Sequence, residues 1–294
     1  MPFNVACIQT NCQDDLGQNV VEVMPLVEKA AQAGADLICL PENAFLMEDQ
    51  GKKLFQKAVP LLEHPGIIAC STLARLYGAW ILIGSVPVRD TKKRPITPDM
   101  SHTERVLAKS QRPSEKVFNT SILIDDKGMI IRDYQKIHLF DVDLPNGESY
   151  RESNRFSAGK AAPVVDLPWG KMGLSICYDV RFPQLYRDLA HAGAEMLAIP
   201  AAFTQTTGEG HWHVLQRARA IENSCFVFAA AQWGVHPGNR KTYGHSLIID
   251  PWGKVLADGG EGEKVIMATI DMDEVRKTRE KIPSLNNDRE YKIC

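Results

Sequence analysis

A single cysteine stands at the end of an apolar run in the segment GLSICYDVRFP, residues 173–183. Residues 172–176 are typical of a buried strand and a helix-like stretch begins at Pro183, so Cys177 lies at a strand-to-helix turn. The N–H groups that open a helix favour negative charge. We therefore expect the thiol to lose its proton easily and to act as a nucleophile. For a cysteine seen alone, a small buried side chain at a strand end is the commoner role.

Two other reactive side chains stand in a similar position. Glu42 directly follows the apolar run 37–41 (LICLP), and Lys136 follows the strand-like run 130–135 (IIRDYQ). In α/β sheets, ligands bind outside the carboxyl ends of the strands. A carboxylate there can act as base toward a thiol, and an ammonium can stabilise a developing oxyanion. Each residue alone is weak evidence, but together with Cys177 they predict a nucleophilic site that attacks a carbonyl.

Histidines offer an alternative base, as in thiol proteases and acyltransferases. His138 and His245 are available, but neither is better placed in the sequence than Glu42. The pair His211 and His213 could suggest a metal site, but residues two apart diverge on a helix, and helical residues follow them. We therefore expect no metal.

Short apolar runs alternate with helical stretches along the chain, and these elements must position the reactive side chains. Turn signals at 125–128 (DDKG) and 250–253 (DPWG) indicate hairpins among the strand–helix units. The mixture predicts an α/β protein with layered sheets rather than one purely parallel sheet. Strands are expected at 3–9, 36–40, 80–86, 121–125, 129–134, 172–176, 196–199, 225–231, 245–250 and 265–270, and helices at 18–32, 65–77, 183–192 and 214–223.

An internal repeat indicates two similar halves. Residues 33–41 (AGADLICLP) match residues 192–200 (AGAEMLAIP) in type at every position, and the copies lie about half the chain apart. That distance is too long for a solenoid repeat. The copies differ at the next position, where Glu42 stands against Ala201. The glutamate is therefore an addition specific to one half.

Composition narrows the class of protein. The chain has 294 residues, enough for one large α/β domain, and its 34 basic residues nearly balance 36 acidic ones. This balance argues against a nucleic-acid partner or a polybasic membrane attachment. The sequence begins without the pattern of a secretory signal and contains no apolar run of about 18 residues. An odd number of cysteines, seven, makes a disulfide framework unlikely and favours a reducing cytoplasm.

Two segments differ from the rest of the chain. Residues 91–117 are polar and interrupted by prolines, which is typical of a loop insertion that acts as a lid or is simply tolerated. Residues 271–294 form a C-terminal tail, and we expect its segment 286–291 (NNDREY) to reach a partner subunit. The remainder is consistent with one domain over 1–294.

Three separate blocks carry a resemblance to a known family. The blocks PEN at 41–43, KIHLF at 136–140 and CYDVRFP at 177–183 resemble the signature blocks of the nitrilase superfamily of carbon–nitrogen hydrolases, in the same order. The similarity extends from VACIQ at 5–9 to YGHSL at 243–247. The chain therefore resembles this family over nearly its whole length.

The resemblance implies a four-layer αββα sandwich of two similar halves. It implies Glu42 as the general base, Lys136 as the oxyanion-stabilising cation and Cys177 as the nucleophile. The backbone N–H of Tyr178 would be a second oxyanion donor, and Glu152 a supporting carboxylate. Hydrolysis would then proceed through a thioester acyl-enzyme without metal or organic cofactor. A non-catalytic protein on the same fold would be expected to lack one of these residues, and none is lacking.

The substrate class also follows from the resemblance. The blocks 136–143, 151–154 and 200–204 are similar to the ω-amidase and deaminated glutathione amidase branch. This similarity implies a small linear amide as substrate, most closely deaminated glutathione, with 2-oxoglutarate and cysteinylglycine as products. The alternatives are an ω-amidase acting on α-ketoglutaramate or α-ketosuccinamate, and an N-carbamoyl amide hydrolase. Members of the family commonly form dimers, which implies a homodimer or larger homo-oligomer.

Three further residues are candidates for substrate binding. Arg181, four residues past the cysteine, suits a dicarboxylate-like substrate through charge-assisted hydrogen bonds. Its alternative role is a structural brace for the turn. Phe203 and Thr204 end the block PAAFT and are expected to line the acyl pocket.

Overall fold

The computed structural model describes residues 2–89, 117–145 and 147–294. The predicted insertion 91–117, except Val117, lies outside the described residues. The prediction that it acts as a lid also falls on those residues.

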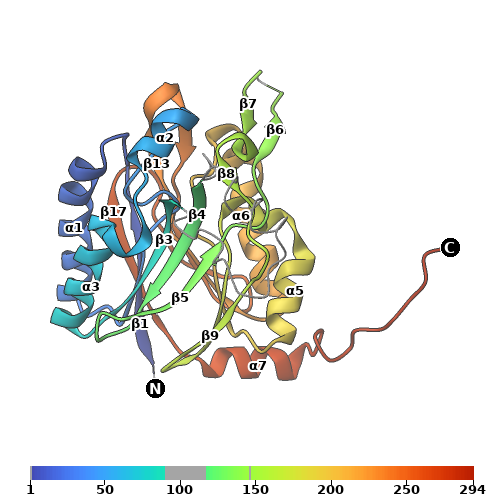
Figure 1. The fold of residues 1–294 in the computed structure, drawn as a ribbon. Coiled ribbons are helices and arrows are strands. Elements are labelled where there is room, and N and C mark those ends of the chain that lie inside the picture. The colour runs from blue at the N-terminus through green and yellow to red at the C-terminus, as the bar shows by residue number, and fades with distance from the viewer. Residues whose placement is uncertain (1, 90–116, 146) are drawn as a thin grey trace, which may run out of the picture.

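The elements form four layers (Figure 1). Helices α1 (Leu16–Gln32) and α3 (Pro65–Tyr77) cover the outer face of one sheet. A second sheet packs against its inner face, and helices α5 (Pro183–His191) and α6 (Gln205–Asn223) cover the far side. This arrangement is the αββα sandwich that the resemblance to the family implied, and it has the layered sheets that the residue patterns predicted.

The first sheet has the strand order β17-β1-β2-β3-β4-β5, and β8 pairs with β4. β1, β2 and β3 are parallel, whereas β17 pairs antiparallel along all of β1. A strand from near the C-terminus thus completes the sheet that begins at the N-terminus. The bounds are β1 (Phe3–Gln9), β2 (Leu37–Cys39), β3 (Trp80–Arg89), β4 (Val117–Ile124), β5 (Ile130–Gln135), β8 (Phe156–Ser157) and β17 (Lys264–Ile270).

The second sheet has the order β16-β15-β12-β11-β10-β9, again with three parallel strands, β10, β11 and β12, at its centre. The two predicted hairpins are confirmed, because β4 pairs antiparallel with β5 and β15 with β16. The bounds are β9 (Val164–Leu167), β10 (Gly170–Leu174), β11 (Met196–Ala198), β12 (Phe226–Ala229), β15 (Leu247–Ile249) and β16 (Val255–Asp258).

Several short elements lie outside the sheets or were not expected. Two ribbons pair β6 with β7 and β13 with β14. Helix α7 occupies part of the predicted C-terminal tail, and its Val275 is buried. No helix among the described residues is long and apolar enough to cross a membrane. The bounds are α2 (Gly51–Lys57), β6 (Asp141–Asp143), β7 (Ser149–Arg151), β13 (Trp233–Val235), β14 (Lys241–Tyr243) and α7 (Asp273–Lys281).

The internal repeat marks equivalent strands of the two halves. Its copies contain β2 and β11, and each of these strands lies between two parallel neighbours. The ends of the copies meet at Gly84, where an added Cβ would lie 2.1 Å from the carbonyl oxygen of Leu40 and 2.4 Å from Pro200. Glycine at this position lets the two sheets approach closely, just where Glu42 leaves the first of them.

Helix α6 is longer than predicted. It begins at Gln205, whereas the sequence analysis placed its start at residue 214. Glycines at 208 and 210 are poor helix formers and disfavour an earlier start. Gly208 is buried against β14, and a Cβ there would lie 2.3 Å from the ring of Tyr243. A tertiary contact therefore selects glycine in a turn that local propensity disfavours.

The main core lies between the two sheets. Leu37 and Leu82 from the first sheet share one buried cluster with Leu197 and Phe228 from the second. A second cluster fills the space between the first sheet and helices α1 and α3. Burial of these apolar faces holds the sheets together and fixes the strand ends that carry the reactive side chains.

Candidate active site

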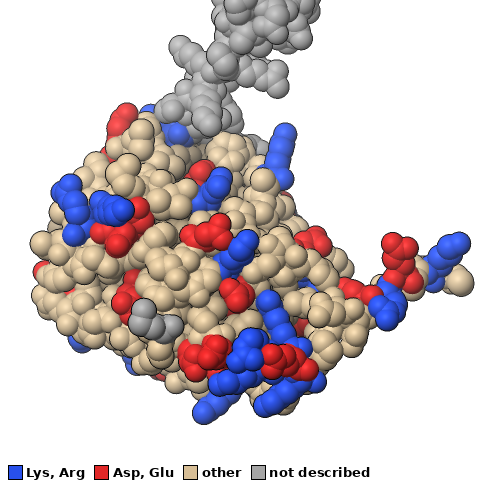
Figure 2. All heavy atoms as spheres, turned by 90° about the horizontal axis from the view of Figure 1, so that it is seen from below, with Lys and Arg blue, Asp and Glu red and all other residues tan. Residues whose placement is uncertain are grey.

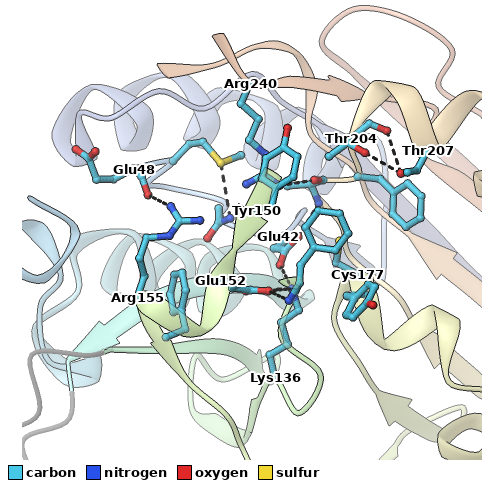
Figure 3. Close-up of a pocket in the computed structure, with 17 residues that line it drawn as sticks. Glu42, Glu48, Lys136, Tyr150, Glu152, Arg155, Cys177, Thr204, Thr207 and Arg240 are labelled. Atoms are coloured by element: carbon cyan, nitrogen blue, oxygen red, sulfur yellow. Dashed lines mark hydrogen bonds and ion pairs between the residues drawn. The ribbon is translucent and has the colours of Figure 1, made fainter. Parts of the chain in front are cut away.

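The three predicted reactive residues meet in one cavity (Figure 3). Glu42 follows β2, Lys136 directly follows β5, and Cys177 comes shortly after β10. Their exposed fractions are 2%, 2% and 6%, so all three are buried. The carboxylate and the ammonium come from the first sheet and the thiol from the second. The cavity therefore depends on how the two sheets pack.

Lys136 is held between two carboxylates. Its Nζ donates to Glu42 Oε1 at 2.8 Å and to Glu152 Oε2 at 2.9 Å. The amide of Asn119 donates to both carboxylates, at 2.9 and 3.2 Å. Burial alone lowers the pKa of Lys136, but the charges of Glu152 and Glu42 raise it above its usual value. The side chain is therefore a fixed cation, and Glu152 occupies the supporting position predicted for it.

Glu42 is poised as an ionised base. Its Oε2 accepts a hydrogen bond from the backbone N–H of Ala202 at 2.8 Å, while Oε1 faces Lys136. Burial raises the pKa of this carboxyl, but the neighbouring ammonium of Lys136 outweighs burial and holds the pKa below its usual value. The carboxylate is thus charged at neutral pH although it is almost fully enclosed.

Cys177 has a different protonation state from the one predicted. Burial and the charge of Glu42 raise the pKa of its thiol well above the usual value, against the smaller opposing effect of Lys136. The expectation of an easily lost proton is therefore wrong. The 3₁₀ helix that starts at this residue, Cys177–Arg181, is too short to offset burial beside a carboxylate. The thiol remains protonated at rest, with a base in contact with it.

The backbone at the cysteine is held in an unusual conformation. Cys177 has φ of 50°, in the left-handed region, and its N–H donates to the carbonyl oxygen of Pro200 at 2.9 Å. No acceptor for the N–H of Tyr178 is found among the described residues, apart from any bond inside the short helix. This geometry suits the predicted role of that N–H as an oxyanion donor.

Asp179 is a functional residue that the sequence analysis missed. Its buried carboxylate accepts hydrogen bonds from the hydroxyl of Tyr134 at 2.6 Å, from the N–H of Ile176 at 2.8 Å and from the N–H of His138 at 3.1 Å. It therefore ties the turn that carries the thiol to the chain on both sides of Lys136. The residue stands in the CYD block, but a carboxylate two positions past a cysteine gives no indication of this role.

The predicted substrate-binding residues are only partly in the cavity. Phe203 and Thr204 line it, and Thr204 shares a 2.7 Å hydrogen bond with Thr207. Arg181 is not among the lining residues. Its guanidinium lies 5.2 Å from the centre of the Phe203 ring and within 3.3 Å of His211 Nδ1. Its predicted contact with substrate therefore stays a prediction, and the contacts seen are those of a brace.

Two arginines other than Arg181 line the cavity, Arg155 and Arg240. Both stand in polar stretches, RESNR and PGNRK, that contain no apolar periodicity to indicate burial. They were therefore missed in the sequence.

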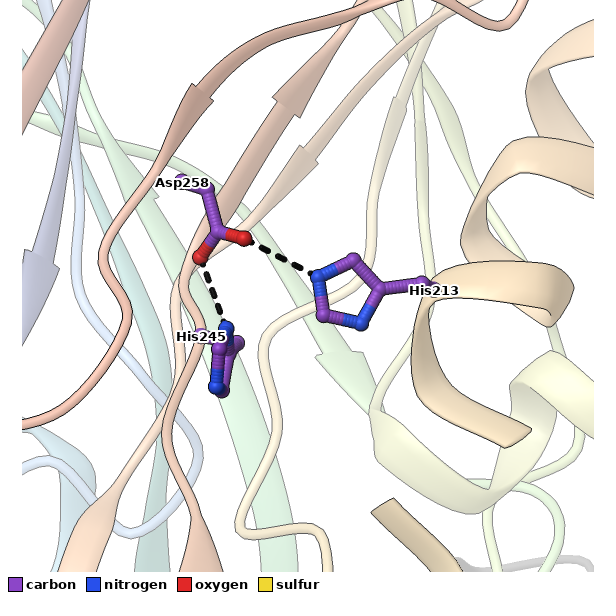
Figure 4. A group of neighbouring side chains, drawn as sticks. All are labelled: His213, His245 and Asp258. Atoms are coloured by element: carbon purple, nitrogen blue, oxygen red, sulfur yellow. Dashed lines mark hydrogen bonds and ion pairs between the residues drawn. The ribbon is translucent and has the colours of Figure 1, made fainter. Parts of the chain in front are cut away.

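The histidines form a separate cluster at the surface. His213 Nε2 and His245 Nδ1 lie 3.0 and 2.9 Å from the two carboxylate oxygens of Asp258 (Figure 4). The possible ligand atoms lie within 4.8 Å of one another, so this group has the chemistry to hold a transition-metal ion. The partner of His213 is thus not His211, two residues away, but a residue 45 positions along the chain.

The histidine bases considered for the thiol lie elsewhere. His138 Nδ1 is 2.7 Å from Asp179 Oδ1, and its ring stacks on Phe182 at 3.5 Å. His245 belongs to the cluster with Asp258. Neither is among the residues that line the cavity with Cys177. This placement favours Glu42 as the base.

Comparisons with known proteins agree on one family. The family profile described as carbon-nitrogen hydrolase matches residues 4–280. A deaminated glutathione amidase of Synechocystis is 39% identical, over 97% of this chain and 98% of its own. The enzyme of the same name from Dictyostelium discoideum is 38% identical, over 97% and 92%. The human one is 37% identical, over 97% and 82%.

Solved structures share the fold. The Caenorhabditis elegans NitFhit protein matches with a TM-score of 0.84 and 34% identity, covering 98% of this chain and 65% of the longer one. The chain thus spans just under two thirds of that protein. Saccharomyces cerevisiae Nit3, described as a member of branch 10 of the nitrilase superfamily, matches with a TM-score of 0.79 and 29% identity, over 96% and 94%.

Proposed function

Because the chain belongs to the carbon–nitrogen hydrolase family, we propose that it is an amidase whose reaction is carried by Cys177, Glu42 and Lys136. The observation that carries this proposal is a lysine paired with two buried carboxylates beside a buried thiol. Such a group has no evident structural advantage, since buried ion pairs contribute little net stability. It does supply a nucleophile, a base and a cation within one enclosed space.

In the first half of the reaction, the sulfur of Cys177 attacks the amide carbonyl carbon while its proton passes to Glu42. The carbonyl oxygen takes up negative charge near Lys136 and the N–H of Tyr178, which stabilise it. The tetrahedral intermediate collapses, the carbon–nitrogen bond breaks, and the nitrogen takes the proton from Glu42. An amine leaves, and the acyl group remains bound to sulfur as a thioester.

In the second half, Glu42 removes a proton from a water molecule that attacks the thioester. The second intermediate collapses, a carboxylic acid is released, and the thiolate regains its proton from Glu42. The resting state has an ionised Glu42 and a protonated thiol, as the pKa directions of both groups require. One carboxylate therefore serves as base and acid in turn.

For the substrate, we propose deaminated glutathione, cleaved to 2-oxoglutarate and cysteinylglycine. Support comes from relatives of that name, which are 34–39% identical over 97% of this chain. An ω-amidase acting on α-ketoglutaramate or α-ketosuccinamate is the second candidate, since the same three residues would serve it. An N-carbamoyl amide hydrolase is the third, and it would release carbon dioxide together with ammonia.

The test is to measure 2-oxoglutarate released from deaminated glutathione and from α-ketoglutaramate under the same conditions. We expect the first substrate to have the higher kcat/KM. Cys177→Ala should abolish turnover, whereas Cys39→Ala, which also alters a buried cysteine but lies outside the cavity, should retain it. Failure of the unaltered protein to hydrolyse either substrate would refute the proposal.

We also propose that the protein works as a homodimer or larger homo-oligomer in the reducing cytoplasm. The support for the compartment is that all seven cysteines are free thiols. Sedimentation analysis at several protein concentrations tests the assembly. A monomer at every concentration would contradict it.

A further inference from the structure

Arg240 lies at the wall of the reaction cavity with unused hydrogen-bonding capacity. Its Nη2 donates to the carbonyl oxygen of Ala202 at 2.7 Å, and its guanidinium lies 5.5 Å from the centre of the Tyr150 ring. Its Nε is buried and has no hydrogen-bond partner among the described residues. A buried donor without an acceptor is costly, and an ordered water, an ion or a bound ligand can satisfy it.

Arg155 is a second cation on the same wall. Its Nη1 donates to the backbone oxygen of Glu48 at 2.8 Å, and its guanidinium lies 5.9 Å from the ring centre of Phe156. Burial and the positive charge of Arg240 lower the pKa of Arg155. The two guanidinium groups are therefore close enough to repel each other in a poorly solvated place.

Neither cation contacts a carboxylate directly in the described part of the chain, although the charges of Glu152, Asp49 and Glu48 act on Arg155 and Arg240 acts on Glu42. Within the described residues, the arginine–carboxylate contacts closer than 4.0 Å are those of Arg151, Arg219 and Arg276, and none involves Arg155 or Arg240. Two like charges at one wall, both held by backbone carbonyls, have the donor pattern of a site for an oxyanion. Guanidinium groups bind carboxylates through strong, charge-assisted hydrogen bonds.

The position of the pair indicates which part of a substrate it meets. Arg155, Arg240 and Tyr150 line the reaction cavity and also a second, more open hollow of about 560 Å³ next to it. During the reaction the acyl group stays attached to Cys177, while the amine must leave before water can enter. The more open hollow is therefore the place for the leaving amine, and its volume is within the range of small-molecule sites.

We propose that Arg155 and Arg240 form a carboxylate subsite for the leaving group. The enzyme then favours amides whose amine part is an amino acid or a short peptide with a free carboxylate. This inference rests on the proposed amidase function and adds to it a specificity on the side of the bond that leaves. It predicts that the charge of the amine part, rather than its size, decides the efficiency of acylation.

The test uses substrates that share one acyl group. Deaminated glutathione and α-ketoglutaramate both transfer a 2-oxoglutaryl group, but only the first has a leaving group with a carboxylate. In Arg155→Gln and Arg240→Gln we expect kcat/KM for deaminated glutathione to fall about 10- to 100-fold, the effect of one charge-assisted hydrogen bond. For α-ketoglutaramate we expect a smaller loss, so the ratio of kcat/KM for the two substrates falls in both variants. Arg276→Gln, at an exposed helix position, is the matched control.

A measurement on the unaltered enzyme removes any dependence on folding of the variants. In the unaltered enzyme, deaminated glutathione whose glycine carboxylate is converted to an amide should have a kcat/KM lower than that of deaminated glutathione by about the same factor. For this amide, Arg240→Gln should cause no further loss. Equal losses for both natural substrates would overturn the inference, since the arginines would then act on the acyl part or on the fold. No turnover of either substrate by the unaltered enzyme would refute the proposed function itself, and the subsite with it.

Discussion

Replacing Glu42 by glutamine separates the chemical role of this carboxylate from its structural one. The change keeps the shape of the side chain and removes its charge. With the amide oxygen turned toward Lys136, the amide NH₂ faces the backbone N–H of Ala202, which now loses its 2.8 Å acceptor. One unsatisfied buried donor costs about 1–3 kcal/mol of folding stability. Lys136 still has Glu152 at 2.9 Å, so no buried charge is left uncompensated.

The expected loss of activity exceeds the expected loss of stability. Removing a general base lowers the rate of acylation by about 10²- to 10⁴-fold. This factor corresponds to about 2.7–5.4 kcal/mol in the barrier at 1.36 kcal/mol per tenfold change. A domain of ordinary stability, about 5–15 kcal/mol, remains folded after the smaller cost. We therefore expect a folded and nearly inactive protein.

The same variant should make the thiol more acidic. Glu42 raises the pKa of Cys177 and Lys136 lowers it, so removing the carboxylate shifts the titration of the thiol to lower pH. Three measurements are needed: ammonia or keto-acid release, the pH dependence of thiol modification by methyl methanethiosulfonate, and urea unfolding. Glu28→Gln, which also removes a partly buried carboxylate, is the control for stability. Hydrolysis within about threefold of the unaltered enzyme would refute the role of Glu42 as base.

Three further changes test the surrounding structure. Asp179→Asn should lower kcat about tenfold or more and leave KM nearly unchanged. The reason is that the carboxylate joins the turn at Cys177 to the chain on both sides of Lys136. Equal changes in kcat and KM would contradict this role. In the unaltered protein, Cys177 should react with a thiol reagent more slowly than the exposed Cys294 at pH 7. Because the pKa of Cys177 is raised, its reaction rate should keep rising well into the alkaline range. Cys294→Ser separates the two signals. Asp258→Asn should cost about 0.5–1 kcal/mol at pH 7 by urea unfolding, a small value because the side chain is about one-third exposed. Hydrogen bonds from His213 keep the pKa of Asp258 below its usual value, although burial raises it. That stabilisation is present above about pH 4 and lost below it, so a difference from the unaltered protein that persists at pH 2 would exclude the carboxylate as its source.

Local sequence patterns predicted the elements that form the centre of each sheet. The apolar runs at β1, β2, β10 and β11 are buried on both faces, and continuous apolar sequence is the pattern that such strands require. The short ribbons and α7 were not predicted, since they bury few apolar residues. Helix α6 was predicted too short because the contact of Gly208 with Tyr243, far along the chain, outweighs the low helix propensity of glycine.

The sequence by itself determined which side chains could react and that each follows a strand, because residue type and strand pattern are local properties. Their positions at strand ends predicted one shared site and the resemblance to a family implied the same, whereas the distances came from packing. Only the tertiary structure decided the protonation of the site. Burial and the charge of Glu42 raise the pKa of Cys177, an effect opposite to the one expected from the turn alone. It also placed Arg155 and Arg240 in the lining of the cavity and Arg181 over the ring of Phe203, outside that lining. The reason is that desolvation and charge–charge interactions depend on distances between residues far apart in the chain, and no local pattern encodes those distances.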